Sequence, residues 1–412
     1  MSVDDRCFVI VGAGQAGAWV ARTLRAEGFS GRIVMIGDED HPPYERPPLS
    51  KSILSGGTSI AEAVLLARDQ ASLDQIDLVV GESVVAIDTR RRTVRCASER
   101  SVAYDTLFLT MGSRARILPS VGSTPSERVH YIRTIDDALR LKTAMGNCQS
   151  MAVVGGGWIG LEVAATARGQ GADVTVLEAG PRLCARSVPQ QVSEYLARLH
   201  QREGVDIRVS VSIESIEVRD DVVVVNSNAG TVRVDQLVIG IGIVPATDLA
   251  EAAGIKIADG IMVDDQCRTS DPHIYAAGDV TSHPCAQAGG YRRLESWANA
   301  QNQAIVAAKA ALGQNVTYGD VPWAWSDQFD VNLQILGHPE RGALVVARGD
   351  AQHGPCCWLV LGEAGETLGA VSANAPRELR VVRKAIGGSQ TLDPAKWADS
   401  VCALADVSMI SA

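Results

Sequence analysis

Two copies of one short pattern impose the strongest constraint on how this chain of 412 residues can fold. The stretch FVIVGAGQAGAWVARTL covers residues 8–24, and MAVVGGGWIGLEVAATA repeats its spacing at residues 151–167. In each copy an apolar run leads into a glycine-rich turn and then into helical spacing. A second apolar run follows, at residues 33–36 and 174–177, so each copy predicts a strand–helix–strand unit.

The rest of the chain predicts further strands around these units. Residues 77–96 and 212–242 alternate between apolar and polar residues, which favours antiparallel inserts or meanders over helical crossovers. From Val321 onward the pattern indicates three or more strands, followed by a helix at residues 377–386. We therefore expect an α/β fold with two Rossmann-like dinucleotide-binding domains and a C-terminal α+β domain.

Composition excludes several classes of function. The formal net charge of −10 argues against a nucleic-acid partner, because phosphate binding requires a basic field. No apolar run approaches the roughly 18 residues of a membrane span, and we expect a cytoplasmic protein without a membrane anchor. The nine cysteines contain no C-x-x-C pair, which argues against a zinc ribbon and a thioredoxin-type redox pair.

The glycines of each turn suit a bound dinucleotide. The first glycine permits a tight bend, the second lets the backbone approach a pyrophosphate, and the third lets helix and strand pack closely. The N-terminus of the helix then offers free N–H groups to the phosphates. The three positions are occupied by Gly12, Gly14 and Gly17 in the first turn and by Gly155, Gly157 and Gly160 in the second.

An acidic residue near the end of the following strand indicates which nucleotide binds. A carboxylate there accepts hydrogen bonds from ribose hydroxyls and repels a 2′-phosphate. Asp38 or Glu39 occupies this place after the first turn, and Glu178 occupies it after the second. Glu178 therefore favours NADH over NADPH, although Arg182 and Arg186 lie close enough in sequence to soften that preference.

A second group of signals indicates that the first turn holds a flavin. One predicted strand ends at Thr110 and is followed by Gly112, and the stretch with Gly240 and Gly242 is its counterpart after the second turn. Asp279 follows another short strand and Gly278, where a carboxylate can accept hydrogen bonds from a ribityl or ribose chain. Taken alone, Asp279 is equally typical of a helix cap or turn.

In this order, the motifs resemble the two-dinucleotide-binding flavoproteins of the glutathione-reductase fold over essentially the whole chain. The stretches PPYERPPLSK (residues 42–51), LESWANAQNQA (294–304) and WAWSDQF (323–329) are similar to those of ferredoxin reductases that serve oxygenase systems. The resemblance implies FAD at the first turn and NADH at the second. It implies an FAD domain of residues 1–112 and 245–320, an NAD domain of 113–244 and a C-terminal domain of 321–412.

The resemblance also implies a function. The protein would take a hydride from NADH and pass single electrons to a [2Fe-2S] ferredoxin that supplies a haem-thiolate monooxygenase or a Rieske-type dioxygenase. An NADH oxidase, a quinone-type flavoprotein or a regulatory flavoprotein like apoptosis-inducing factor are the alternatives. Because no cysteine occurs between Cys7 and Cys96, the thiol relay of the disulfide reductases is excluded.

The resemblance assigns three catalytic residues. Lys51 would lie near the hydride-accepting nitrogen of the flavin and pair with Glu162, which would hold the cation in place. Glu295, together with Glu162, would bind the carboxamide of the nicotinamide and orient the ring. The structural alternative for a lysine is a solvated surface charge.

The resemblance and the turns together give two sets of cofactor-binding residues. The set for FAD contains Gly12, Gly14, Ala16, Gly17, Asp38, Arg46, Lys51, Val84, Thr110, Gly112, Arg133, Gly278, Asp279, Trp297 and Trp325. The set for NADH contains Gly155, Gly157, Trp158, Ile159, Gly160, Glu162, Glu178, Arg186, Gly242 and Glu295. For Trp325 core packing is the alternative, and the two roles are compatible.

The expected partner is an acidic ferredoxin, which requires a local basic patch on this acidic protein. The candidates are two groups of basic residues, Arg292 with Arg293, and Arg377, Arg380, Arg383 and Lys384 on the last predicted helix. A plain solvated helix face is the alternative. The iron–sulfur cluster would belong to the partner, because no spacing in this chain suits cluster or metal ligands. We expect a monomer or a homodimer.

Overall fold

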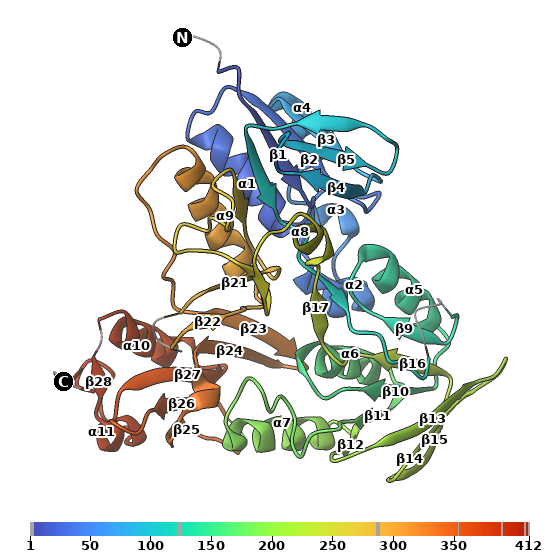
Figure 1. Ribbon diagram of the computed structural model, residues 1–412. Coiled ribbons are helices and arrows are strands. Elements are labelled where there is room, and N and C mark those ends of the chain that lie inside the picture. The colour runs from blue at the N-terminus through green and yellow to red at the C-terminus, as the bar shows by residue number, and fades with distance from the viewer. Residues whose placement is uncertain are drawn as a thin grey trace. The chain divides into compact units, whose positions relative to one another are not determined.

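The computed structural model describes residues 4–121, 126–285, 289–352, 354–388, 390–407 and 409–410. Contacts within the chain divide it into two compact units (Figure 1). Unit 1 consists of Met1–Arg46, Ile60–Arg114 and Val244–Asp320. Unit 2 consists of Pro47–Ser59, Ala115–Ile243 and Val321–Ala412. The predicted three-domain division stays a prediction.

Unit 1 is built around a parallel sheet of five strands in the order β20-β7-β1-β2-β3. The strands are β1 (Cys7–Val11), β2 (Arg32–Ile36), β3 (Ile76–Val79), β7 (Thr106–Leu109) and β20 (Ile274–Ala276). The apolar run of β1 is buried because the sheet is covered on both faces. This is the doubly wound arrangement that the first glycine turn predicts.

Two layers cover this sheet. Helices α1 (Gln15–Ala26) and α9 (Trp297–Ala311) pack against each other and share a core with the side chains of Phe8 and Ile10. The opposite face carries a small antiparallel sheet, whose strands are β4 (Val84–Asp88), β5 (Thr93–Cys96) and β6 (Ser101–Ala103). Both faces of the parallel sheet therefore lie in apolar cores.

Unit 2 repeats this arrangement around the second turn. Its parallel sheet has the order β12-β11-β10-β16-β9. The strands are β9 (Val129–Tyr131), β10 (Ser150–Val154), β11 (Asp173–Leu177), β12 (Asp206–Arg208) and β16 (Gln236–Ile239). The helices of this part are α5 (Ile135–Met145), α6 (Trp158–Gly169) and α7 (Gln190–Arg202). An antiparallel sheet of β13 (Ile213–Val218), β14 (Val223–Ser227) and β15 (Gly230–Val234) shares a core with the parallel strands.

The expectation that residues 77–96 and 212–242 are antiparallel throughout was wrong for one strand in each stretch. Strand β3 pairs in parallel with β2 at the edge of its sheet, where three of its four residues are partly exposed, so the strand is not a continuous apolar run. Strand β16 lies between β10 and β9 and is buried along its whole length. A parallel strand that is covered on both faces appears in the sequence as an apolar run. Here that run follows the antiparallel strands β13–β15 directly, so the sequence did not separate it from them.

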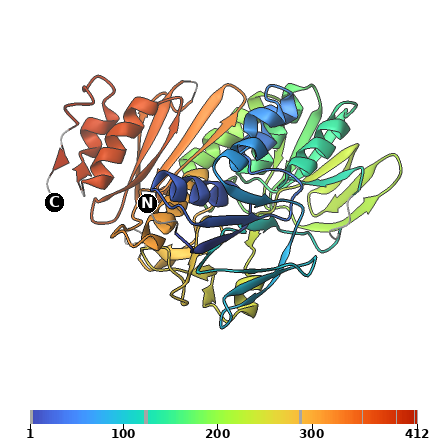
Figure 2. The ribbon, with the colours of Figure 1, turned by 90° about the horizontal axis from the view of Figure 1, so that it is seen from above.

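Unit 2 also contains the C-terminal sheet, in which every neighbouring pair is antiparallel and the order is β23-β24-β27-β26-β25. Its strands are β23 (Trp323–Gln328), β24 (Val331–Gly337), β25 (Leu344–Gly349), β26 (Cys356–Leu361) and β27 (Thr367–Ala373). Helices α10 (Pro376–Gly387) and α11 (Pro394–Ala398) pack on this sheet, as Figure 2 shows in red. The predicted strands and the helix near residues 377–386 are present.

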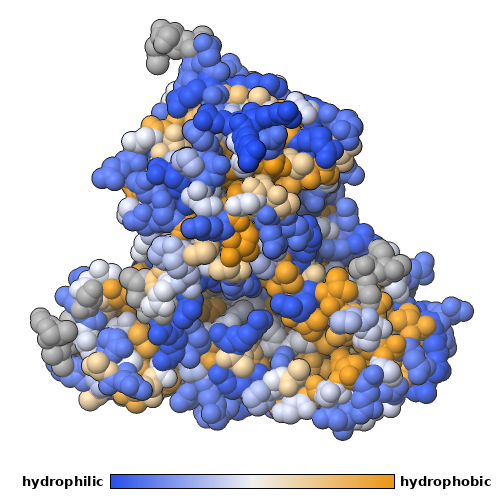
Figure 3. All heavy atoms as spheres, in the orientation of Figure 1, coloured by the Kyte–Doolittle hydropathy of each residue, from blue (hydrophilic) through white to orange (hydrophobic). Residues whose placement is uncertain are grey.

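The remaining elements are short. They are η1 (Pro47–Ser50), α2 (Ser52–Ser55), α3 (Ile60–Ala63), α4 (Arg68–Leu73), β8 (Ser113–Ala115), β17 (Ile243–Pro245), α8 (Asp248–Ala252), β18 (Ile257–Ala258), β19 (Gly260–Met262), β21 (Thr281–Pro284), β22 (Tyr291–Arg292), η2 (Pro339–Arg341), β28 (Thr391–Leu392) and β29 (Met409–Ile410). Polar residues predominate on the face drawn in Figure 3, with apolar patches between them. Within the described ranges, no helix is both long enough and apolar enough to cross a membrane.

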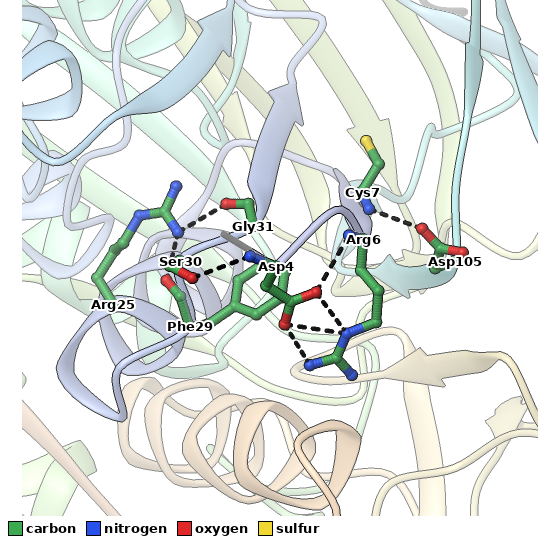
Figure 4. A network of polar contacts seen from close by, with 8 residues as sticks. All are labelled: Asp4, Arg6, Cys7, Arg25, Phe29, Ser30, Gly31 and Asp105. Atoms are coloured by element: carbon green, nitrogen blue, oxygen red, sulfur yellow. Dashed lines mark hydrogen bonds and ion pairs between the residues drawn. The ribbon is translucent and has the colours of Figure 1, made fainter. Parts of the chain in front are cut away.

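Each unit contains an arginine that binds four backbone carbonyls. In unit 1, Arg25 of α1 donates to the carbonyls of Phe29, Gly31, Asp74 and Gln75 at 2.6 to 2.9 Å. Figure 4 shows this side chain beside Phe29 and Gly31, close to the start of β2. In the same view Asp105 accepts a hydrogen bond from the backbone N–H of Cys7, which ties β1 to the turn before β7.

In unit 2, Arg348 of β25 is buried and binds four backbone carbonyls of the C-terminal segment. Its guanidinium donates to the carbonyls of Trp397, Asp399, Ser400 and Cys402 at 2.7 to 3.3 Å. Five N–H donors in a planar fork let one arginine satisfy several carbonyls at once. The indole of Trp397 is fully buried beneath this segment, so Arg348 closes the C-terminal core.

We expect Arg348→Met to lower the stability of the C-terminal sheet. The methionine keeps much of the apolar stem but removes the charged donor that four backbone carbonyls share, which costs about 2–4 kcal/mol. The variant should unfold at a lower urea concentration and be cut earlier by protease near residues 397–402. The matched control is Arg377→Met on the exposed side of α10, which should leave both measurements unchanged. Equal midpoints for the two variants would contradict the role given to Arg348.

Candidate dinucleotide-binding and catalytic sites

The first glycine turn joins β1 to α1 in unit 1 and requires glycine for two separate reasons. Gly12 has φ +109°, and a Cβ there would collide with the carbonyl of Thr110. A Cβ at Gly17 would collide with the carbonyl of Gly12. The hydroxyl of Thr110 lies 2.9 Å from the carbonyl oxygen of Gly12 and 3.0 Å from that of Val11, so it holds the turn against the strand.

The space in front of this turn fits a pyrophosphate. A Cβ on Gly14 would meet no described atom within 4 Å, so the second glycine faces open space. Gly14 is the N-cap of α1, and no described side chain caps that helix. The side-chain amide of Gln15, the first helical residue, is buried without a hydrogen-bond partner among the described residues. Free N–H groups at a helix N-terminus beside open space suit the phosphates of a dinucleotide such as FAD.

The second turn, in unit 2, repeats this geometry. Gly155 has φ +108°, and a Cβ there would collide with the carbonyl of Gly240. Gly160 packs in the same way against the carbonyl of Gly155, whereas Gly157 faces open space. Gly157 is the N-cap of α6, and no described side chain caps the helix. The residues at this turn therefore fit a second dinucleotide, such as NADH.

The acidic residues that follow the two turns are placed differently. Glu178 follows β11 directly, and its carboxylate accepts hydrogen bonds from the N–H groups of Gly156 (2.5 Å) and Gly180 (2.6 Å). This carboxylate is therefore held at the second turn, where a ribose would need an acceptor. After the first turn Asp38 is exposed. Its neighbour Glu39 instead accepts hydrogen bonds from Tyr44 (2.5 Å) and Arg46 (2.6 Å).

The turn with Gly278 and Asp279 is anchored by a glutamine that the sequence analysis missed. Gln303 of α9 is fully buried, and its side-chain oxygen accepts hydrogen bonds from the N–H of Gly278 (2.9 Å) and the hydroxyl of Thr281 (2.7 Å). Asp279 accepts a hydrogen bond of 3.2 Å from Ser113. Gln303 belongs to the quoted stretch LESWANAQNQA, where polar residues interrupt an alanine-rich helix and could have signalled its role.

Unit 2 contains the predicted pair of Lys51 and Glu162. Lys51 is the N-cap residue of α2, and its Nζ lies 3.0 Å from Oε1 of Glu162 on α6. Only 2 % of the Glu162 side chain is exposed, against 15 % for Lys51. Ser326 of β23 donates a hydrogen bond of 2.6 Å to the same oxygen, and Ser50 donates one to the other carboxylate oxygen.

This environment acts on the charge of Glu162 in two opposite ways. Burial raises the pKa of the Glu162 carboxyl above its ordinary value, because desolvation disfavours the charged form. The Lys51 ammonium and the two serine hydroxyls oppose that shift. Ser50 and Ser326 were not predicted from the sequence, although each stands next to a predicted site residue. Serine is common on protein surfaces, and neither position alone indicated a carboxylate partner.

An aromatic stack lies beside the ion pair. The Nζ of Lys51 is 5.8 Å from the ring centroid of Trp325, which stacks on Trp323 at 5.2 Å. The guanidinium of Arg383 lies 5.9 Å from the ring of Trp323. A cation close to an aromatic ring is attracted by its negative face. The stack therefore links the basic helix α10 to Lys51 within unit 2.

The remaining predicted residues are placed as follows. In unit 1, Glu295 is exposed and pairs with Arg293, and Trp297 at the start of α9 donates a hydrogen bond of 3.2 Å to Glu45. Val84 begins β4, Gly112 has φ +65° and Ala16 is buried in α1. In unit 2, Trp158 and Ile159 begin α6, Arg186 lies beside Gly242, and the backbone N–H of Arg133 donates to Asp137. Their roles in cofactor binding stay predictions.

None of the nine cysteines, all of which lie in the described ranges, forms a disulfide. Burial raises the pKa of Cys148 to about 11 and that of Cys356 to about 12. Burial also raises the pKa of Cys184, which packs against the second turn. Because the thiolate is the reactive form, these three side chains are poor nucleophiles at neutral pH.

Comparisons with known proteins place the chain in a family. Residues 7–304 match the family model described as pyridine nucleotide-disulphide oxidoreductase, and residues 323–408 match the one described as reductase C-terminal. The chain is 40% identical to the ferredoxin–NAD(+) reductase component of the p-cumate 2,3-dioxygenase system of Pseudomonas putida, over 98% of this chain and 99% of that one. The corresponding component of the anthranilate 1,2-dioxygenase system of Burkholderia cepacia is also 40% identical, with the same two coverages.

Among solved structures, the covalent putidaredoxin reductase–putidaredoxin complex is similar over 98% of both chains, with a TM-score of 0.94 and 32% identity. The fold, the two glycine turns and the full-length identities agree with one another. This chain therefore belongs to the pyridine nucleotide-disulphide oxidoreductase family and, within it, to the ferredoxin–NAD(+) reductases.

Proposed function

We propose that this protein is the FAD-containing ferredoxin reductase of an oxygenase system, which takes a hydride from NADH and passes single electrons to a [2Fe-2S] ferredoxin. The observation that carries the proposal is the buried pair of Lys51 and Glu162, held by Ser50 and Ser326. The segment that follows the second strand of the first unit thus supplies a lysine and not a cysteine pair. The relatives that serve dioxygenase systems support a Rieske-type dioxygenase as the final acceptor.

The residues of the two turns would hold the cofactors. The first turn would bind FAD together with Arg46, Thr110 and Asp279, and the second would bind NADH. Once bound, FAD supplies a centre that accepts two electrons at once and releases them singly. The ammonium of Lys51 would stabilise negative charge that develops beside it. Glu162 holds this ammonium in place and, with Glu295, would orient the nicotinamide through its carboxamide.

The docking surface for an acidic ferredoxin is best assigned to α10. Arg377, Arg380, Arg383 and Lys384 are all exposed on this helix. In the other candidate group, Arg293 already pairs with Asp259 at 3.1 Å and with Glu295, which reduces its charge for a partner. Arg383 also begins the aromatic stack that ends at Lys51. A cytoplasmic location and a monomeric or homodimeric state remain predictions.

Anaerobic stopped-flow spectroscopy tests the proposed function directly. We expect NADH to bleach the flavin of the purified protein, and a [2Fe-2S] ferredoxin then to restore its colour in one-electron steps. If ferredoxin left the reduced protein unchanged while oxygen, peroxide or a quinone reoxidised it, the protein would be an oxidase or a quinone reductase.

We expect Glu162→Gln to slow the bleaching of the flavin by NADH. The glutamine keeps the shape of the side chain but removes the charge that holds Lys51, and losing such a contact costs about 100-fold in rate. Because burial raises the pKa of Glu162, the wild-type rate should fall as the pH is lowered through that raised value, which protonates the carboxylate. The variant should lack this acidic limb.

The matched control for this experiment is Glu194→Gln on the exposed face of α7. It should retain both the wild-type rate and the acidic limb. A Glu162→Gln variant that bleached at the wild-type rate with an unchanged pH profile would refute the role of the buried pair.

We expect Glu178→Gln to weaken the preference for NADH over NADPH. The amide removes the negative charge that repels a 2′-phosphate, and losing one charged hydrogen-bonding partner changes the ratio of the two kcat/KM values by roughly 10-fold. Steady-state kinetics with both nucleotides measures this ratio. Urea unfolding of the same variant reports any loss of the hydrogen bonds to Gly156 and Gly180. An unchanged ratio would mean that another group selects the nucleotide.

We expect Arg380→Glu to slow electron transfer to ferredoxin without slowing the bleaching by NADH. Reversing one charge at a docking surface reduces the association rate by about 10-fold at low salt, and high salt screens this difference. Stopped-flow measurements at two salt concentrations check both statements. Arg90→Glu, on the exposed turn between β4 and β5, is the matched control and should behave as wild type.

A further inference from the structure

A chain of buried polar side chains leads from the ion pair to helix α7, within unit 2. Ser326 donates to Oε1 of Glu162 at 2.6 Å, and the side-chain nitrogen of Gln328 donates to Ser326 at 3.0 Å. The side-chain oxygen of Gln328 lies 2.9 Å from Nε2 of His200. Ser326, Gln328 and His200 are each at most 1 % exposed. Bulk water therefore does not supply these hydrogen bonds.

The hydrogen bonds of this chain have one direction when Glu162 is charged. A serine hydroxyl has a single proton, and a carboxylate can only accept. Ser326 must therefore give its proton to Glu162 and accept the N–H of Gln328. The oxygen of Gln328 then faces His200, whose Nε2 must carry a hydrogen. Every donor in the chain points toward the carboxylate.

Protonation of Glu162 would allow the opposite direction. The carboxyl O–H could donate to Ser326, and Ser326 could donate to the oxygen of a Gln328 amide turned by half a rotation. The amide nitrogen would then donate to Nε2 of His200, which would move the proton of the imidazole to Nδ1. The tautomer of His200 is thus coupled to the charge of Glu162.

The surroundings of His200 do not fix its tautomer. The hydrogen bond with Gln328 therefore determines which ring nitrogen carries the proton. Its Nδ1 has no hydrogen-bond partner among the described residues, and the ring packs edge-on against Phe329 at 5.0 Å. Burial lowers the pKa of His200, and the hydrogen bond with Gln328 and the charge of Glu203, the C-cap residue of α7, partly oppose this. Arg202, near the end of α7, pairs with Glu203 at 3.2 Å and with Asp330, which follows β23, at 4.0 Å.

The surroundings of Glu162 contain few other ionisable groups. Lys51 faces the carboxylate from the N-cap of α2. Burial raises the pKa of the Cys184 thiol, in the segment after β11, and the charges of Glu178 and Glu162 raise it further. The charge of Glu162 is therefore balanced by Lys51 on one side and by the hydrogen-bond chain on the other.

We propose that His200 and Gln328 are positioning residues that act through Ser326 to keep Glu162 ionised and turned toward Lys51. The effect on hydride transfer rests on the function proposed above, whereas the effect on the charge of Glu162 does not. Among the described hydrogen bonds, none joins His200 or Gln328 directly to Lys51 or Glu162. His200 holds the amide of Gln328 so that its N–H donates to the oxygen of Ser326. The hydroxyl proton of Ser326 is then directed at the carboxylate of Glu162.

Two substitutions of His200 test the proposal with a matched control. His200→Phe removes the donor and keeps an aromatic ring, whereas His200→Gln keeps an N–H near the position of Nε2. His130 of β9 is also buried in unit 2, and its Nε2 lies 3.0 Å from the side-chain oxygen of Gln236, but no described contact connects it to Glu162. His130→Phe therefore removes the same kind of pair without touching the chain.

The main measurement is the pH at which Glu162 becomes protonated in the flavin-containing protein, without NADH. Infrared difference spectra report the carboxylic acid, and the band that Glu162→Gln removes belongs to this residue. We expect His200→Phe to raise the midpoint by about 1 pH unit, the scale for weakening a hydrogen bond to a charged group. His200→Gln and His130→Phe should keep the wild-type midpoint. Equal midpoints for His200→Phe and His130→Phe would overturn the proposal.

A measurement on the wild-type chain keeps the proposal testable if the phenylalanine variant does not fold. Nitrogen-15 NMR distinguishes the two neutral tautomers of histidine, and the signal that His200→Gln removes identifies His200. We expect the tautomer with hydrogen on Nε2 at neutral pH. A proton on Nδ1, or a charged ring, would overturn the proposal.

Stopped-flow bleaching by NADH then separates this proposal from the proposed function. We expect His200→Phe to bleach up to about 10-fold more slowly at a pH well below both midpoints, where the rate follows the ionised fraction of Glu162, and to reach the wild-type rate above the shifted midpoint. If NADH fails to bleach even the wild-type protein, the proposed function is wrong. The infrared and NMR results would still show whether His200 and Gln328 control the charge of Glu162.

Discussion

The buried charge of Glu162 is the constraint on which the organisation of unit 2 depends. An ionised carboxylate that leaves water loses several kcal/mol of solvation, and only a close cation and good hydrogen bonds offset that loss. The partners are Lys51, Ser50 and Ser326. They come from a short segment near residue 50 and from the first strand of the C-terminal sheet, which are far apart in sequence. Contact with one carboxylate helps to explain why Pro47–Ser59 belongs to unit 2 and not to the unit that surrounds it in sequence.

The two glycine turns solve one packing problem with different neighbours. In both turns, a backbone carbonyl lies so close to the first glycine that a Cβ there would collide with it. The absence of a Cβ on the third glycine lets the helix approach the turn. The position directly after the second strand differs, because Glu178 there bonds to the turn while its counterpart Gly37 has no side chain. Gly37 instead packs against Ala13. The carboxylate near the first turn comes from Glu39 and forms an ion pair with Arg46. The two turns therefore have similar backbones but different charged side chains beside them.

Local pattern was sufficient to predict the strands and helices that flank the turns. Strand β1 begins and ends where its apolar run does, and the glycines mark the start of α1. The partners of buried polar groups could not be predicted in this way. Ser50 and Glu162 are 112 residues apart, and Ser326 and Glu162 are 164 apart, so no window of sequence contains both. For the same reason the parallel pairing of β3 and β16 was not predicted, since strand pairing is decided by distant neighbours and not by alternation alone.

Strand β23 shows how one short segment can serve two sides of a site. Side chains alternate across a strand, so Trp323 and Trp325 share one face while Ser326 and Gln328 share the other. The tryptophans stack beside Lys51, and the polar pair reaches Glu162 and His200. A shift of one residue along β24 would exchange the two faces and place indole rings against the carboxylate. The pairing of Trp325 with Gln334 and of Ser326 with Leu333 therefore determines the charge environment of Glu162 as much as it determines the sheet.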